Sequence, residues 1–262
     1  MDRYIFYFLL FIIYAFLGYI CEVVYVYIIT KKITNRGYLY GPVVPIYAFG
    51  ALLIIIPLTE FEFSSFITDR WYLVALIGFF GTSLLEYLTS FIMEKIFHMR
   101  WWDYSDKFLN INGRVCLRNS LMFMGLVLLV IYLINPFLNN AIKYVMDIHP
   151  LAYILAAILF VVFVTDIVFS TIKNINISKI ILKLDELKAS ANNKIDEFKV
   201  SADLKKEELS AKFDEAKVKF DSYFANVKDK LTKVSIKYPS FKLIKDKKRI
   251  SLRDMLNKKN KD

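Results

Sequence analysis

Four ionisable side chains interrupt otherwise apolar stretches of this sequence: Glu22, Glu86, Arg118 and Asp166. A charge at the centre of a membrane-spanning helix costs about 2.5–3.5 kcal/mol, so such groups are expected to face inward and to find partners. Carboxylates countered by Arg118 or Arg114 would line a polar cavity. These residues are the first candidates for a functional site.

The three carboxylates lie at a similar depth within their stretches. Glu22 and Glu86 are about seven residues from one end and Asp166 about six, which at 1.5 Å per residue is a depth of ~10 Å. Arg118 enters from the same side and is shallower. The pattern indicates either a cavity open at that side or structural hydrogen bonds and snorkelling at helix contacts. Both interpretations remain open for Glu22 and Glu86, and the structural role is favoured for Asp166.

No catalytic constellation accompanies these charges. The sequence has no metal-ligand spacing and no glycine-rich phosphate loop, and its two histidines, His98 and His149, fall in different connections. Cys21 and Cys116 lie in apolar stretches and are expected to pack as small apolar residues. We therefore expect no catalytic residues, no cofactor and no metal.

The elements that must position these residues are membrane helices. Of 262 residues, 56% are hydrophobic and 23% charged, and the two kinds are segregated, because most of the apolar residues precede Lys173. A spanning helix needs roughly 20 apolar residues. The sequence thus predicts an all-α membrane bundle over 1–175, with five spans at 4–29, 38–58, 71–93, 115–134 and 151–172.

Charges in the connections predict the orientation. The first and third connections are basic: Lys31, Lys32 and Arg36, then Lys95, Arg100, Lys107 and Arg114. The second is acidic, with Glu60, Glu62, Asp69 and Arg70, and the fourth has only Lys143 and Asp147. By the positive-inside rule, a multi-pass protein of the cell membrane is expected, with its N-terminus outside and its C-terminus cytoplasmic.

The second stretch and the third connection have unusual compositions. Gly41-Pro42 and Pro45 interrupt the start of the 38–58 stretch, which indicates a proline-kinked or late-starting helix or, less favoured, a break that lines a site. Trp101, Trp102 and Tyr104 are amphipathic rings suited to the headgroup level, with Arg100 and Asp103 reaching water. Interface anchoring is favoured over a ligand-binding role for that connection.

Three ordered segments resemble a known family: ITNRGYLYGPVVPIYAFGA at 33–51, EYLTSFIMEKIF at 86–97 and RWWDYSDKFLNINGRVCLRNS at 100–120. They are similar to the CmpB-like type IV ABC-transporter permease family over about residues 4–172. This chain has Gly18-Tyr19 where the family usually has Gly-Trp. The matching positions are Glu22, Asn35, Arg36, Gly37, Gly41, Pro42, Pro45, Tyr47, Glu86, Glu94, Trp102, Asp103, Tyr104, Ser105, Asn112, Gly113, Arg114 and Cys116.

The tail predicts a further helix. Leu187, Phe198, Leu209, Phe220 and Leu231 recur every eleven residues, which keeps them on one face of a helix over about 176–236. A partner helix or the membrane surface would cover this stripe. The basic segment 237–262 either remains solvated or contacts anionic lipids.

The resemblance implies a non-enzymatic, permease-like subunit of a transport system. Its expected partners are membrane lipids, further copies of the chain and a separate ATPase, since no Walker motif is present, and nucleic acid is not expected. The alternatives are a membrane scaffold or regulator acting through its tail, and an enzyme using Glu22, Glu86 and Arg114 on a lipid headgroup or lipid-linked substrate. Water-filled space around the carboxylates would favour transport or catalysis.

The orientation can be tested by cysteine accessibility. A cysteine introduced near Glu62 should react with an impermeant maleimide from outside the cell, because the second connection is acidic. One introduced near Lys107 should react only after permeabilisation. The reverse pattern would contradict the orientation.

Overall fold

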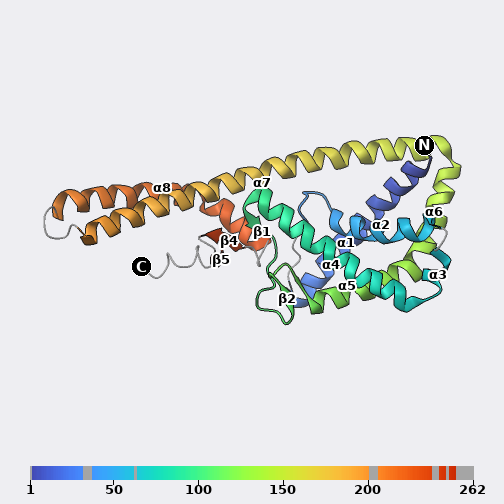
Figure 1. Ribbon diagram of the computed structural model, residues 1–262. Coiled ribbons are helices and arrows are strands. Elements are labelled where there is room, and N and C mark those ends of the chain that lie inside the picture. The colour runs from blue at the N-terminus through green and yellow to red at the C-terminus, as the bar shows by residue number, and fades with distance from the viewer. Residues whose placement is uncertain are drawn as a thin grey trace. The chain divides into compact units, whose positions relative to one another are not determined.

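The computed structural model describes residues 2–31, 37–61, 64–200, 206–237, 242–245 and 248–251 (Figure 1). The chain is largely helical, which confirms the predicted fold class at that level. It divides into two compact units, the first comprising Met1–Ile96 and Arg100–Ser170, and the second comprising Phe97–Met99 and Thr171–Asp262.

The elements follow one another as helices joined by short connections. They are α1 Asp2–Thr30, α2 Pro45–Glu60, α3 Ser64–Thr68, α4 Trp71–Phe97, β1 Met99–Arg100, β2 Asn110–Ile111, β3 Val115–Cys116, α5 Leu117–Leu129, the π-helical turn η1 Val130–Ile134, α6 Asn135–Asp147, α7 His149–Val200, α8 Lys206–Lys237, β4 Lys242–Lys245 and β5 Lys248–Ser251. Within the described residues, four helices are long and apolar enough to cross a membrane: Asp2–Ile28, Trp71–Phe97, Leu117–Asp147 and His149–Leu184.

The second predicted span is shorter than expected. Residues 37–44 are not helical, and α2 begins at Pro45, whose missing N–H is no loss at the first helical position. Its 16 residues reach only about 24 Å, less than the ~30 Å of bilayer hydrocarbon. Of the two favoured alternatives, a proline-kinked helix and a late-starting one, the structure shows the late start.

The fourth predicted span continues beyond residue 134. α5, η1 and α6 form a continuous helical segment from Leu117 to Asp147, so the fourth connection is helical where a loop was expected. The backbone N–H of Asn135 reaches the carbonyl of Val130, and Pro136 follows with no N–H to donate. A π turn accommodates such a gap in the hydrogen-bond ladder.

The core of the first unit lies around α1. Leu10, Tyr14 and Ala15 of α1 pack in one buried cluster with Ile55 of α2, and also with residues of α6 and α7. A second cluster joins α2, α4 and α5 through Ile54, Leu58, Val74 and Val127. Small residues at these contacts let the helix backbones approach closely, as is usual in membrane bundles.

The second unit contains the tail helices. The Nζ atom of Lys183 in α7 lies 5.3 Å from the centroid of the Tyr223 ring in α8, so the two helices run side by side there (Figure 1). Leu184 and Leu231 are each 1% exposed. The single helix predicted over about 176–236 is therefore wrong, because Lys183 and Tyr223 could not meet within one straight helix. Of the predicted stripe, Leu187 and Phe220 are half-buried. The side chains of Phe198 and Leu209 and residues 201–205 lie outside the described residues.

A substitution at Gly18 tests the packing of α1 on α2. A Cβ atom there would lie 2.4 Å from the Cβ and Cγ atoms of Tyr47, which cannot retreat without moving α2. Overpacking of this kind costs about 1–3 kcal/mol, so Gly18→Ala should lower the thermal unfolding midpoint in detergent.

The matched control is Gly125→Ala. No atom lies within 4 Å of a Cβ placed at Gly125, and alanine is the better helix former. This variant should leave the midpoint unchanged or raise it. Equal midpoints for both variants would contradict the packing described here.

Candidate functional site

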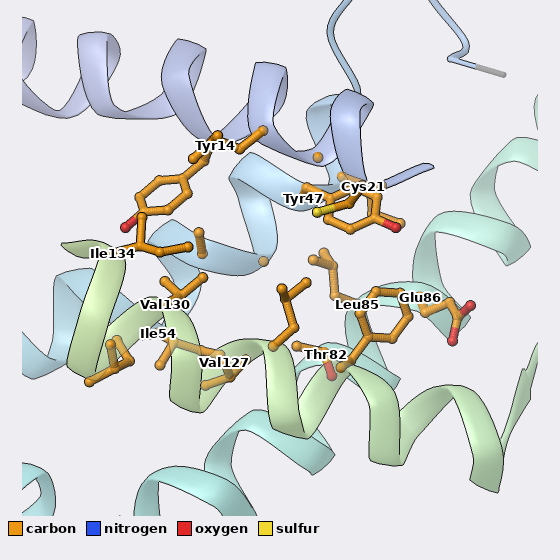
Figure 2. Close-up of a pocket in the computed structure, with 18 residues that line it drawn as sticks. Tyr14, Cys21, Tyr47, Ile54, Thr82, Leu85, Glu86, Val127, Val130 and Ile134 are labelled. Carbon is orange, nitrogen blue, oxygen red and sulfur yellow. The ribbon is translucent and has the colours of Figure 1, made fainter. Parts of the chain in front are cut away.

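A cavity of about 90 Å³ lies within the first unit, between α1, α2, α4 and the α5–η1 segment. Its lining is largely apolar, and Figure 2 shows Tyr14 near one end and Glu86 near the other. Tyr47 and Cys21 lie on the side formed by α1 and α2, and Thr82 on the side formed by α4. The cavity therefore connects an apolar interior to one of the carboxylates singled out in the sequence.

Glu86 is buried, with only 4% of its surface exposed. Its Oε1 atom accepts a hydrogen bond of 3.2 Å from the Tyr104 hydroxyl, and the Asn119 side chain is close enough to stabilise the carboxylate. Its Oε2 atom is buried and has no hydrogen-bond partner among the described residues. A buried carboxylate oxygen in this condition is costly, which marks Glu86 as a place where a partner can bind.

Glu22 lies beside the same group of residues. The Tyr47 hydroxyl donates a 3.0 Å hydrogen bond to its Oε1 atom. Glu22 is also close enough to Glu86 and Tyr104 to act electrostatically on both. The structure thus brings together Glu22, Tyr47, Glu86 and Tyr104 from α1, α2, α4 and the third connection.

The hydroxyl group of Tyr104, a residue expected at the headgroup level, donates its hydrogen bond to the buried Glu86. Burial, and after it the charge of Glu86, raises the pKa of Tyr104 well above its usual range. The phenol therefore keeps its proton and remains a hydrogen-bond donor to the carboxylate.

Asp166 has a different role. Its two carboxylate oxygens accept hydrogen bonds from the backbone N–H groups of Tyr40 (2.9 Å) and Gly41 (2.8 Å), just before α2. Ser170 donates to the same carboxylate and accepts from Tyr40. A Cβ atom on Gly41 would lie 2.9 Å from Asp166 Oδ2. Asp166 thus satisfies backbone groups that the missing first turns of α2 leave unpaired.

Arg114 does not pair with Glu22 or Glu86 in the described contacts. It forms an ion pair of 2.8 Å with Glu94, which Arg100 also contacts through its Nε atom. The guanidinium of Arg114 lies over the rings of Tyr87 and Phe91, at 5.5 and 5.3 Å from their centroids. Both arginines are buried, although Arg100 was expected to reach water.

A tight turn places Arg114. Asn112 and Gly113 both have positive φ, 53° and 68°, and the Arg114 N–H reaches the Ile111 carbonyl at 2.9 Å. This turn closes the β2–β3 hairpin, whose two antiparallel strands pair Ile111 with Val115. The turn directs the chain back toward α4, where Glu94 lies.

The rest of the third connection folds over the same turn. The indole Nε1 of Trp102 donates to the Arg114 carbonyl at 3.0 Å, and the Tyr104 N–H donates to the Gly113 carbonyl at 2.8 Å. Asp103 accepts from the backbone N–H of Ser105. These residues therefore shape the connection, and only Tyr104 among them reaches Glu86 in the described contacts.

The remaining predicted site residues lie elsewhere. Arg118, in the first turn of α5, is exposed. Gly41 and Pro42 belong to the non-helical segment before α2, and Asn35 and Arg36 lie outside the described residues. In the part of the chain that the structure describes, no cluster of three or more His, Cys, Asp or Glu residues could hold a metal ion.

Two interactions could not be found from the sequence. Ser83 donates to or accepts from Ser120 at 2.7 Å between α4 and α5, and Tyr14 donates to Asn135 at 3.3 Å. Single polar residues in apolar stretches give no indication of the helix they will face. The pairing of Glu94 with two arginines was not predicted either, since Glu94 was named only as one of the positions that match the family.

Comparison with known families gives one match. Residues 9–171 match the family described as "Putative ABC-transporter type IV". The chain belongs to this family. Comparisons with curated proteins and with solved structures gave no match. Together with its apolar helices, membership of this ABC-transporter family makes the chain a membrane protein related to transport.

The ABC-transporter match covers the residues that form the cavity. It begins in α1 and ends within α7, one residue beyond Ser170, where the first compact unit ends. Glu22, Glu86 and Asp166 all fall inside it. The tail helix α8 falls outside it.

Substitution of Asp166 tests its role at the start of α2. Asp166→Ala removes the acceptor of two backbone N–H groups, and hydrogen bonds to a charged group contribute about 1.5–3 kcal/mol each. The variant should unfold at a clearly lower temperature in detergent, whereas Asp166→Asn, which retains one acceptor oxygen, should lose less. Asp147→Asn is the control, because Asp147 is exposed at the end of α6. A midpoint for Asp166→Ala as high as that of the control would contradict this role.

Proposed function

We propose that this chain is a permease-like, non-enzymatic subunit of a transport system, and that the cavity ending at Glu86 is its substrate site. The observation that carries the proposal is the buried Glu86 oxygen without a hydrogen-bond partner among the described residues, in the lining of a cavity. If every carboxylate oxygen were paired and no cavity lay beside Glu86, a scaffold role would be favoured instead. Largely apolar cavities with few polar groups are typical of binding sites.

We infer that α2 is a fifth crossing, although it is short. Arg3 contacts Glu60 at 3.2 Å, and Tyr7 donates to the same carboxylate at 2.7 Å, so the beginning of α1 lies beside the end of α2. The Tyr153 hydroxyl, near the start of α7, hydrogen-bonds Asp2. These contacts support alternating helix directions. The basic first and third connections support a location of the N-terminus outside and of the carboxylates nearer the cytoplasm.

The proposed partners follow from the size of the cavity. A space of about 90 Å³ is a small pocket and not a continuous pathway. A second copy of the chain or another membrane subunit would complete a pathway, and a separate ATPase would supply the energy. Lipids would cover the apolar faces of α4 and α7, and no role for nucleic acid is proposed.

A second candidate is a scaffold or regulator that acts through the tail. It is favoured by α7, which continues without interruption for 52 residues, about 78 Å, and is therefore much longer than a bilayer is thick. The contact of Lys183 with Tyr223 gives the tail a partner within its own chain. This candidate predicts binding partners for the tail and no dependence on Glu86.

Purification from the native membrane in mild detergent tests the proposal. A tagged chain should co-purify with a stoichiometric ATPase, and in proteoliposomes the chain should stimulate ATP hydrolysis by that ATPase. Glu86→Gln should reduce this stimulation several-fold while leaving the complex intact, because it changes the cavity and not the surface. Glu60→Gln is the matched control and should behave as the wild type, because Glu60 lies at the end of α2 that is remote from the cavity residue Tyr47.

A chain that purifies without any ATPase would contradict the permease-subunit proposal. Equal stimulation by Glu86→Gln and the wild type would contradict the assignment of the cavity as the substrate site. Loss of a partner on deletion of the tail, with Glu86 irrelevant, would favour the scaffold.

A further inference from the structure

We propose that the cavity binds a small organic cation, with its apolar body among the aliphatic side chains and its charged group at Glu86. This inference rests on the proposed function, because it names the class of substrate that the same cavity would take. It depends on three observations: the charge around Glu86, the nature of the walls and the size of the space.

The charge around Glu86 is negative. The interactions that the described residues make with its carboxylate come from Tyr104, Asn119 and Glu22, and none of these is a cation. Glu22 adds a second negative charge nearby. A buried carboxylate needs a counter-charge or a proton, so the site is suited to a positively charged group and repels an anion.

The neighbouring arginines do not supply that counter-charge in the described contacts. Arg114 and Arg100 both pair with Glu94, and their guanidinium groups are held there by further contacts with Ser90 and with the Asn112 carbonyl. Arg118 is exposed. An incoming cation would therefore provide a charge that the described part of the chain does not place at Glu86.

The walls favour an organic cation over a metal ion. Leu17, Ile46, Leu85, Leu126 and Ile131 line the cavity with aliphatic surface. Alkali and alkaline-earth ions need several oxygen ligands, and Ca²⁺ takes about six to eight. An alkyl group needs none and gains from leaving water.

The aromatic rings in the lining suit the same kind of ligand. The rings of Tyr47 and Phe123 meet edge to face with their centroids 5.9 Å apart, and both line the cavity. An ammonium group is attracted to the face of such a ring. The Tyr47 hydroxyl is held by Glu22, which keeps the ring in place beside the cavity.

The size limits the ligand. A cavity of about 90 Å³ holds several water molecules, since one water needs about 10–15 Å³ of this kind of space, or a small organic group in their place. A short alkylammonium ion is a group of this kind. We therefore choose n-butylammonium as the probe.

Equilibrium dialysis of the purified full-length chain against radiolabelled n-butylammonium, with a detergent-only compartment to correct for micelle partitioning, tests the inference. Binding should saturate near one ion per chain, and unlabelled n-butylammonium should displace the label. Neither 1-butanol nor butyrate at the same concentration should displace it, because the first lacks the charge and the second carries the opposite one.

Variants locate the site. Glu86→Gln should weaken binding at least roughly tenfold, which is about 1.4 kcal/mol. Glu60→Gln should bind as the wild type does, since Glu60 lies at the other end of α2. Ala51→Leu adds bulk to the apolar lining without touching Glu86, and it should also abolish binding.

Several results would overturn the inference. These are displacement by 1-butanol as effective as by n-butylammonium, unchanged affinity in folded Glu86→Gln, or unchanged affinity in Ala51→Leu. The measurement needs no ATPase, so the two proposals fail separately. Cation binding without a co-purifying ATPase would support this inference and contradict the permease subunit, whereas an ATPase complex that binds no cation would contradict this inference alone.

Discussion

The first unit depends on how it satisfies a stretch of backbone that is not helical inside an apolar bundle. Every backbone N–H and C=O group in a membrane must find a partner within the protein, and residues 37–44 lack the partners that a helix would give them. Asp166 accepts from Tyr40 and Gly41, and the Ala15 carbonyl accepts from Val44 at 2.8 Å. The start of α2 is thus tied to α7 on one side and to α1 on the other.

This arrangement explains why similar carboxylates have different roles. Asp166 is satisfied by backbone donors, and Glu94 by two arginines. Glu22 receives a tyrosine hydroxyl, and Glu86 receives a tyrosine and an asparagine but retains one oxygen without a described partner. Glu86 is buried, whereas Glu22, Glu94 and Asp166 are only partly buried, so Glu86 combines the deepest burial with the incomplete set of donors.

The sequence predicted which segments are helical better than it predicted which side chains meet. Apolar length identified the helices, and the prolines identified the irregular start of the second stretch, because both depend on local chemistry. The depth argument placed Glu22, Glu86 and Asp166 along the helix axes, but it contains no information on rotation about those axes. Glu22 and Glu86 lie close together in the structure. Arg114 pairs with Glu94 instead, because the Asn112-Gly113 turn sets the direction of the chain before Arg114.

Other differences arise from contacts between distant segments. The fourth span was predicted to end at residue 134, where the apolar stretch ends, but the helix continues because a π turn accommodates Pro136 and its missing N–H group. Tyr104 is amphipathic, which suits a headgroup or a buried polar partner equally, and only the fold shows that Glu86 is within its reach.

The non-helical segment before α2 positions one wall of the cavity. Asp166 fixes the backbone at Gly41, and six residues later Tyr47 packs against Gly18 and lines the cavity. The geometry of the cavity wall is thus set by hydrogen bonds made outside the cavity itself.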